Sequence, residues 1–360
     1  MVETGPASVC TPGDYTVPGP PNLDEPGDGA PPMTRIVLAI EKANFGETAD
    51  PDAGFLTPPG LDLDCVDTCF QGTASSCVPP NAAAPPCDGV GGRDTRANNL
   101  FNYLAEVEPG LGASVVDSDV GSGKFGVVFR IDNYQGGPNQ EQVVVEAFPS
   151  AGTVEQVGDA YEYTPAKHDG TDLWSYTSSA GTTAGFSTFL DMYAYVTDGV
   201  LVFHFPTFPL LLLPDVGGNM NPLSFDLVDV VGSVTLVEDA SGQWHGINGN
   251  VAGRWAATDA LKGASTLSDN IEDIGDSICG CDAIYRTYWG FICGNVDIAT
   301  NASSDNTGAP CDALSFGFGF TLGPANLTTD PVDPSIVPPD CPAGWAPSCA
   351  PADNPATTCD

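Results

Sequence analysis

Aspartate residues gather between Gly60 and Asn99 in a pattern that suits a hard cation. Ca²⁺ takes about six to eight oxygen ligands, mainly from carboxylates and backbone carbonyls. If this loop folds back on itself, its carboxylates can converge. We therefore predict one structural Ca²⁺ site whose candidate ligands are Asp62, Asp64, Asp67, Asp88 and Asp94.

The spacing of these aspartates is not that of an EF-hand, because the twelfth position counted from Asp62 is Thr73 rather than glutamate. The alternative is a solvated loop whose aspartates form turns and helix caps. A second short motif, Asp117-x-Asp119-x-Gly121, is another candidate Ca²⁺ loop and has the same alternative.

The cysteines divide into two groups at the ends of the chain. Residues 88–278 contain none, five cysteines precede this stretch and seven follow it, so both groups are odd in number. If all are paired within the chain, at least one disulfide must join the groups, which we expect to meet on one side of a cysteine-free core. A zinc site is disfavoured because no histidine lies near them. The expected disulfide residues are Cys10, Cys65, Cys69, Cys77, Cys87, Cys279, Cys281, Cys293, Cys311, Cys341, Cys349 and Cys359.

Charge and cysteine content together indicate the compartment. The formal net charge is -37, which repels nucleic acids and anionic lipids. An even number of cysteines in such a chain is typical of an exported protein. We expect an extracellular or cell-surface location and no membrane-spanning helix, because no run of about 18 apolar residues occurs. Residues 1–10 do not read as a signal peptide, so we expect the numbering to begin at a processed end.

Common catalytic motifs are absent from the sequence. The three histidines, His168, His204 and His245, form no HExxH or GxSxG-type pattern. Glu141 and Glu146 are five positions apart on an expected strand and therefore point to opposite faces. An enzyme is thus the less favoured interpretation.

Several aromatic residues could bind a glycan or another surface protein. Tyr193 and Tyr195 share one face of an expected strand and would form a two-ring platform if that face is open. Ordinary cross-strand packing is the alternative. The other candidates are Trp174 and Trp244.

Period-two apolar patterns from residue 123 onward predict a mainly β fold. Short helices are expected after Thr95 and over 259–274, and Thr197-Asp198-Gly199 predicts a tight hairpin turn. Phenylalanine alternates with glycine in Leu314–Leu322, which indicates a strand with one buried face and a close neighbour on the other. The expected strands are residues 34–41, 123–131, 142–148, 173–177, 192–196, 200–205, 223–227, 233–238, 247–254 and 314–322.

These elements predict an antiparallel β-sandwich or jelly roll with two short helices and disulfide-rich flanking loops. We expect residues 1–31 to form a Pro/Gly-rich arm or linker and residues 327–360 a Pro/Cys-rich tail. Between them, we expect residues 32–326 to form a single β-sandwich domain that contains the Asp/Cys-rich loop 60–99.

The segments GLDLDCVDTC, CDGVGGRDTRANNLF, FRIDNYQGGPNQEQVVV and INGNVAGRW resemble exported Asp/Cys-rich β proteins of myxobacteria and related bacteria. The resemblance implies secretion or surface display and brings no activity with it. We therefore expect a non-catalytic binding, adhesion or structural module, stabilised by disulfides and Ca²⁺. The alternative is a secreted polysaccharide hydrolase that uses carboxylates.

Overall fold

The structure is a computed structural model. It describes residues 16–21, 35–46, 59–80, 85–100, 112–158, 160–183, 186–212, 215–216, 219–220, 223–265, 268–269, 276–277, 279–281, 283–333, 341 and 344–355. Most of the expected arm, much of the expected tail, Cys10 and Cys359 lie outside these residues. So does most of the helix expected after Thr95.

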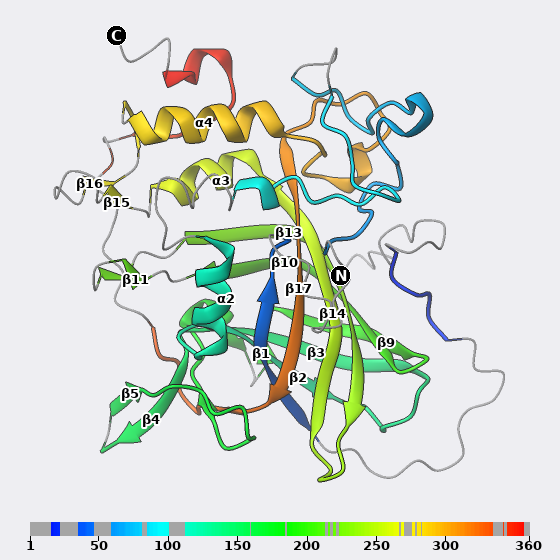
Figure 1. Ribbon diagram of the computed structural model, residues 1–360, viewed down its shortest axis with the longest axis vertical. Helices are drawn as coiled ribbons and strands as arrows, with labels where there is room; N and C mark the ends of the chain where they lie inside the picture. The colour runs from blue at the N-terminus through cyan, green and yellow to red at the C-terminus, as the bar shows by residue number, and fades with distance from the viewer. Residues whose placement is uncertain are drawn as a thin grey trace.

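Eight antiparallel strands close into a barrel (Figure 1). Strand β1 pairs with β17 on one side and with β2 on the other, so the sheet has no free end. In order around the barrel, the strands are β1 (Ile36–Asn44), β17 (Ala313–Pro324), β14 (Trp244–Ala256), β13 (Leu223–Glu238), β10 (Val200–Leu212), β9 (Leu190–Thr197), β3 (Gln140–Ser150) and β2 (Gly126–Asp132).

The predicted sandwich or jelly roll is therefore wrong. Period two shows that one face of each strand is buried, but it does not distinguish two stacked sheets from one sheet rolled on itself. Strand β13 was expected as two strands, 223–227 and 233–238, yet it is continuous through two register irregularities against β14. Such irregularities bend a strand, and bending allows a sheet to close.

Aromatic side chains fill the inside of the barrel. Phe129 contacts Phe203 with 5.4 Å between ring centroids and Phe320 with 6.0 Å, and Phe225 stacks on Phe316 at 5.1 Å. The Phe–Gly alternation of β17 places phenylalanines inside, as expected. On the outer side, a Cβ atom on Gly317 would lie 2.7 Å from the Cα atom of Gly60, which confirms the expected close neighbour.

Small elements cover parts of the outer barrel wall. Helix α2 (Ala113–Gly121) lies beside β1 (Figure 1). A second core, including Val128, Phe148 and Trp174, lies under a small sheet. The small strands are β4 (Thr153–Val157), β5 (Ala160–Tyr163), β6 (Leu173–Trp174), β7 (Thr182–Thr183), β8 (Phe186–Ser187), β11 (Asp215–Val216), β12 (Asn219–Met220), β15 (Ser268–Asp269), β16 (Asp276–Ser277) and β18 (Asn326–Leu327).

The expected hairpin is confirmed. Strands β9 and β10 are joined through Asp198 and Gly199, which have φ angles of 48° and 82°. These positive values are those of a turn that matches the twist of a hairpin. The second expected helix is shorter than expected among the described residues, since α3 spans Ala257–Ala264.

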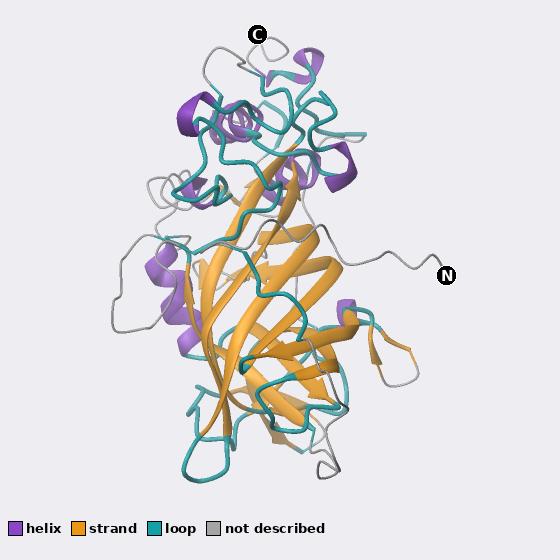
Figure 2. Ribbon diagram, turned by 90° about the vertical axis from the view of Figure 1, so that its right-hand side faces the viewer, coloured by secondary structure: helices purple, strands orange, loops and turns teal. Residues whose placement is uncertain are grey.

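Helices and disulfide-bonded loops gather at one end of the barrel (Figures 1 and 2). Helix α4 (Ala283–Asn295) packs beside α3, and the Tyr288 hydroxyl donates to the Ala260 carbonyl oxygen over 3.0 Å. The short helical turns are η1 (Phe70–Gly72), η3 (Ser178–Ala180), η4 (Ala302–Ser304) and η5 (Pro351–Asp353).

Four disulfides are described, and one of them joins the two cysteine groups. The bridge Cys77–Cys311 spans a sequence separation of 234, which confirms the parity argument. Cys65 and Cys281 are disulfide-bonded as well. The other three described bridges are Cys69–Cys87, Cys279–Cys341 and Cys293–Cys349.

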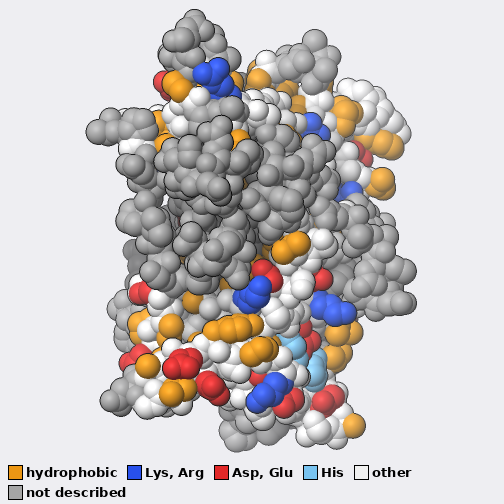
Figure 3. Space-filling view, turned by 60° about the vertical axis from the view of Figure 1, so that its left-hand side comes forward, with side chains coloured by type: hydrophobic (Ala, Val, Ile, Leu, Met, Phe, Trp, Pro, Cys, Tyr) orange, Lys and Arg blue, Asp and Glu red, His pale blue; other side chains and the backbone are white. Residues whose placement is uncertain are grey.

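Among the described residues, no helix is long and apolar enough to cross a membrane. On the face drawn in Figure 3, the described acidic side chains lie among basic and apolar ones rather than in one separate patch.

Candidate metal centre

The Asp/Cys-rich loop is attached to the outer face of the barrel by hydrogen bonds to strand β14. The Asn250 amide accepts from the Gly60 N–H over 2.9 Å and donates to the Gly60 carbonyl oxygen over 2.8 Å. Because Gly60 also lies against Gly317 of β17, the chain enters the loop in direct backbone contact with the barrel.

Arg254 provides a second attachment, and its side chain is fully buried. Its guanidinium donates to the carbonyl oxygens of Leu63 and Ala299 over 2.8 and 2.6 Å. It also forms two bonds with the Asp305 carboxylate, of 3.1 and 2.6 Å. One side chain of β14 therefore binds both the Asp/Cys-rich loop and the segment between α4 and β17.

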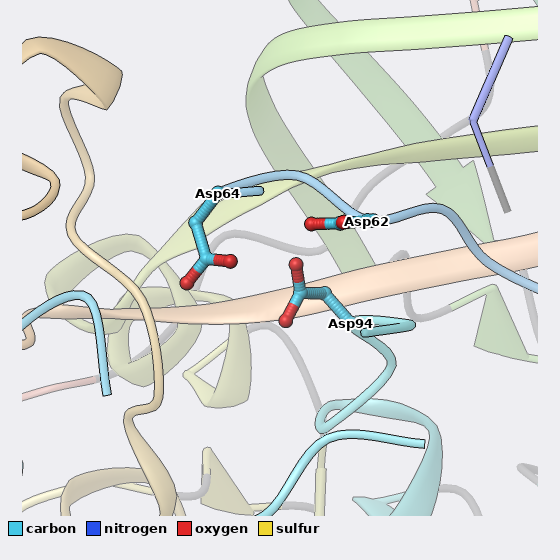
Figure 4. Close-up of side chains that lie close together, drawn as sticks. All are labelled: Asp62, Asp64 and Asp94. Atoms are coloured by element: carbon cyan, nitrogen blue, oxygen red, sulfur yellow. The ribbon is translucent and has the colours of Figure 1, made fainter. Parts of the chain in front are cut away.

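Three carboxylates converge where this loop turns back on itself. One oxygen each from Asp62, Asp64 and Asp94 lie within 4.8 Å of one another. Asp62 and Asp64 come from the first pass of the loop and Asp94 from the returning pass, and their carboxylates turn toward a common space (Figure 4). The Asp94 N–H donates a hydrogen bond to the Leu61 carbonyl oxygen over 2.9 Å, and this bond joins the two passes.

Backbone N–H groups orient these carboxylates. Asp62 accepts from the Cys65 N–H, and Asp94 accepts from the Leu63 N–H, each over 2.7 Å. Asp64 accepts from the Val66 N–H over 2.9 Å and also from the Ser76 hydroxyl. Each carboxylate oxygen has a second lone pair, so these bonds fix direction without exhausting the capacity to bind a cation.

The carboxylates repel one another in a desolvated site. Burial raises the pKa of Asp62 to about 6, with a further contribution from Asp64. Burial, followed by the charges of Asp64, Asp88 and Asp297, raises the pKa of Asp94 well above its ordinary value. Burial likewise raises the pKa of Asp88 to about 7. Burial and mutual repulsion therefore favour binding of protons or of a cation by these carboxylates.

The donor set fits a hard divalent cation. All three candidate ligands are carboxylates, which suit Ca²⁺ or Mg²⁺, whereas zinc sites favour nitrogen or sulfur ligands. Gly92, at a φ angle of 79°, leaves room for the cluster, because a Cβ atom there would lie 3.1 Å from an Asp62 oxygen. Ca²⁺ would complete its coordination with further oxygens, including water.

The other aspartates named from the sequence lie elsewhere. Asp88 accepts from the Thr68 N–H over 2.5 Å and influences the cluster through its charge, while Asp67 is outside the group of three. Asp117 and Asp119 belong to helix α2 rather than to a loop. There Asp117 accepts from the Ala43 N–H over 2.8 Å, and Asp119 pairs with Lys124 at 2.8 Å.

The four aromatic candidates have different environments. Trp174 is buried, and Trp244 packs edge-on against Tyr134 with 5.2 Å between ring centroids. The Tyr195 hydroxyl donates to the carbonyl oxygen of Pro18 over 2.6 Å, whereas Tyr193 is 76% exposed. The structure therefore presents one open ring from the expected pair.

The carboxylate and imidazole candidates for catalysis take part in local pairs. Glu146 is fully buried and accepts from the Arg130 guanidinium over 2.5 Å. His204 lies 2.9 Å from the Asp229 carboxylate, and His245 lies 3.4 Å from Asp239. His168 approaches the carbonyl oxygen of Gly121 at 2.7 Å.

Sequence reasoning missed Asn250, Arg254 and Asp297. Asp297 is buried near the cluster and accepts from the backbone N–H and hydroxyl of Ser315, over 2.9 and 2.6 Å. A signal for the first two was present, because residues 250 and 254 have the same parity in a strand and so share its outer face. Polar side chains on that face are equally typical of exposure to solvent, so this pattern did not reveal that the Asp/Cys-rich loop covers it.

No protein-family model, curated protein or solved structure matches this chain.

Proposed function

We propose that this chain is an exported, non-catalytic binding or structural module in which Ca²⁺ fastens the Asp/Cys-rich loop to the outside of the barrel. The observation that carries the proposal is the convergence of Asp62, Asp64 and Asp94 within 4.8 Å. Ca²⁺ would offset the repulsion between these buried carboxylates and join the two passes of the loop.

The disulfides support an oxidising destination. Bridges of this kind persist mainly in extracellular and periplasmic proteins. The loop that carries the carboxylates is also the loop that Cys77–Cys311 joins to the segment before β17. Cation and disulfide would therefore act on the same segment, which fits a protein displayed outside the cell.

The alternative of a polysaccharide hydrolase requires two carboxylates that face each other across a sugar. Glu146 is committed to a buried pair with Arg130, so the pair Glu141 and Glu146 does not supply that arrangement. The clustered aspartates accept backbone hydrogen bonds inside the loop, which favours a structural role for them.

A calcium titration tests the proposal. Extracellular modules bind Ca²⁺ with a Kd of about 10⁻⁴–10⁻³ M. An excess of about 100-fold over Kd would stabilise the protein by about 2.7 kcal/mol, seen as a rise in Tm over the chelator-treated protein. Isothermal titration calorimetry would give the stoichiometry, expected to be one ion.

Asp94→Asn and Asp67→Asn form a matched pair of variants. Both replace one carboxylate of the same loop by an amide, but only the first alters the cluster. We expect Asp94→Asn to abolish the Tm rise and Asp67→Asn to keep it. An equal Tm in Ca²⁺ and in chelator for the parent protein would remove the metal from the proposal.

A further inference from the structure

Strand β9 contains a bulge that turns two successive side chains outward. The pairing of β9 with β3 shifts on both sides of Val143 and Ala194, so Met192 and Tyr193 occupy an irregular position. Met192 is 52% exposed and Tyr193 is 76% exposed, whereas regular strand residues would alternate between inside and outside.

Asp191 holds this bulge in place. Its carboxylate accepts from the Tyr193 N–H over 2.8 Å and from the His204 N–H, in the neighbouring strand β10, over 2.7 Å. The Asp191 side chain therefore stabilises the bulge through hydrogen bonds on both strands. Bulges of this kind often re-aim side chains beside functional sites.

A pocket of about 480 Å³ opens in the outer barrel wall beside the bulge. Its volume lies within the range of about 300–1,000 Å³ that is usual for small-molecule sites. Val144, Leu190, Met192 and Phe186 give it an apolar surface, and Phe186 is 45% exposed. Arg35, Asp132 and Asn133 supply polar groups.

The charged side chains in and beside this pocket are two arginines and two carboxylates, so their formal charges cancel although the protein as a whole is strongly acidic. Arg35 donates to Asp132 through two bonds of 2.8 and 3.1 Å, and Arg130 lies 3.7 Å from the same carboxylate. Glu146 balances Arg130. A charged ligand would upset this balance, and a purely apolar ligand would desolvate the ion pair without replacing its hydrogen bonds to water.

We propose that this pocket binds one sugar unit of a neutral glycan. The C–H face of the sugar would pack on Phe186 and Met192, with Tyr193 extending the contact to a second unit. Its hydroxyl groups would bond to Asn133 and to the Arg35–Asp132 pair. This inference rests on the binding role proposed above and names the class of partner for it.

A saccharide panel tests the inference on the full chain in excess Ca²⁺. Glucose, galactose, mannose, N-acetylglucosamine and their disaccharides are the neutral probes, and glucosamine and galacturonate are the charged ones. Saturation-transfer NMR would detect binding, and calorimetry would give Kd. We expect at least one neutral sugar to bind and the charged analogues to bind about ten-fold more weakly, which equals about 1.4 kcal/mol.

Phe186→Ala and Phe70→Ala are the matched variants. Both remove an exposed ring, at 45% and 57% exposure, but Phe70 lies in η1 of the Asp/Cys-rich loop. We expect Phe186→Ala to lower affinity about ten-fold or more and Phe70→Ala to leave it unchanged. Absence of binding across the panel, stronger binding of a charged analogue, or binding that survives Phe186→Ala would overturn the inference. The Ca²⁺-dependent Tm, measured separately, would report on the metal alone.

Discussion

Gly60 and Gly317 are in backbone contact across the boundary between loop and barrel: a Cβ atom on Gly317 would lie only 2.7 Å from the Gly60 Cα atom. Neither chain segment can move aside without breaking other bonds, since Gly60 is also held by both groups of the Asn250 amide. The contact fixes where the Asp/Cys-rich loop begins, and hence where Asp62 and Asp64 lie.

Gly317→Ala should therefore destabilise the protein by about 1–3 kcal/mol, the usual cost of overpacking. Urea unfolding followed by tryptophan fluorescence would measure the change. Gly290→Ala is the control, because Gly290 lies in helix α4 with nothing within 4 Å of an added Cβ atom. That substitution should be neutral or stabilising by up to about 1 kcal/mol. Equal effects of the two would contradict the close contact.

Replacement of Arg254 by methionine should cost about 3–5 kcal/mol, because it leaves the Asp305 carboxylate without its partner in a largely buried place. Adding Asp305→Asn to the same chain should recover part of that loss. Lys262→Met, which breaks an exposed pair with Asp259, should change stability by about 1 kcal/mol or less. A small loss for Arg254→Met would show that the loop is held mainly by its other contacts.

Without a cation, stability should fall as pH rises from about 4 to 7. The folded pKa values of Asp62 and Asp297 are about 6 and that of Asp88 is about 7, all above the unfolded value of about 3.9. The folded state therefore binds more protons than the unfolded state in this window, and the slope of stability against pH is negative. Urea unfolding in chelator across this range would measure the slope.

Saturating Ca²⁺ should flatten that pH dependence, because the cation replaces the protons. Asp94→Asn should make the slope in chelator shallower than in the parent, since it removes one titrating carboxylate from the cluster while its amide oxygen can still accept from the Leu63 N–H. A positive slope in chelator would contradict the electrostatic account of the cluster.

Removal of the Cys77–Cys311 bridge should destabilise the protein more than removal of Cys69–Cys87. The separations of 234 and 18 residues correspond to loop-closure contributions of about 5 and about 3 kcal/mol. Paired Cys→Ala variants, unfolded in urea, would measure both. A smaller effect of the long-range bridge would indicate that the reduced, unfolded chain already keeps its ends together.

Local features of the fold could be predicted from the sequence, but its closure could not. Asp198 and Gly199 identify the β9–β10 turn, because positive φ angles need such residues. The pairing of Lys42 with Thr321 closes the barrel and joins distant parts of the chain, and no local pattern encodes it. The same holds for the candidate site. Asp62, Asp64 and Asp94 could be named from the sequence, but the pairing of Leu61 with Asp94, which helps to bring the two passes of the loop together, has no local signal.

The bridge Cys77–Cys311 makes the chain between these two residues a covalent ring that contains β2, β3, β9, β10, β13 and β14, while β1 and β17 stand outside it. A protease that cuts the ring once, for example in the exposed turn at Asp239–Gly242, opens the circle without releasing a fragment. The nicked protein would keep its full mass in electrophoresis until a reducing agent is added. A single cut within the ring would thus leave all eight barrel strands tethered in one molecule.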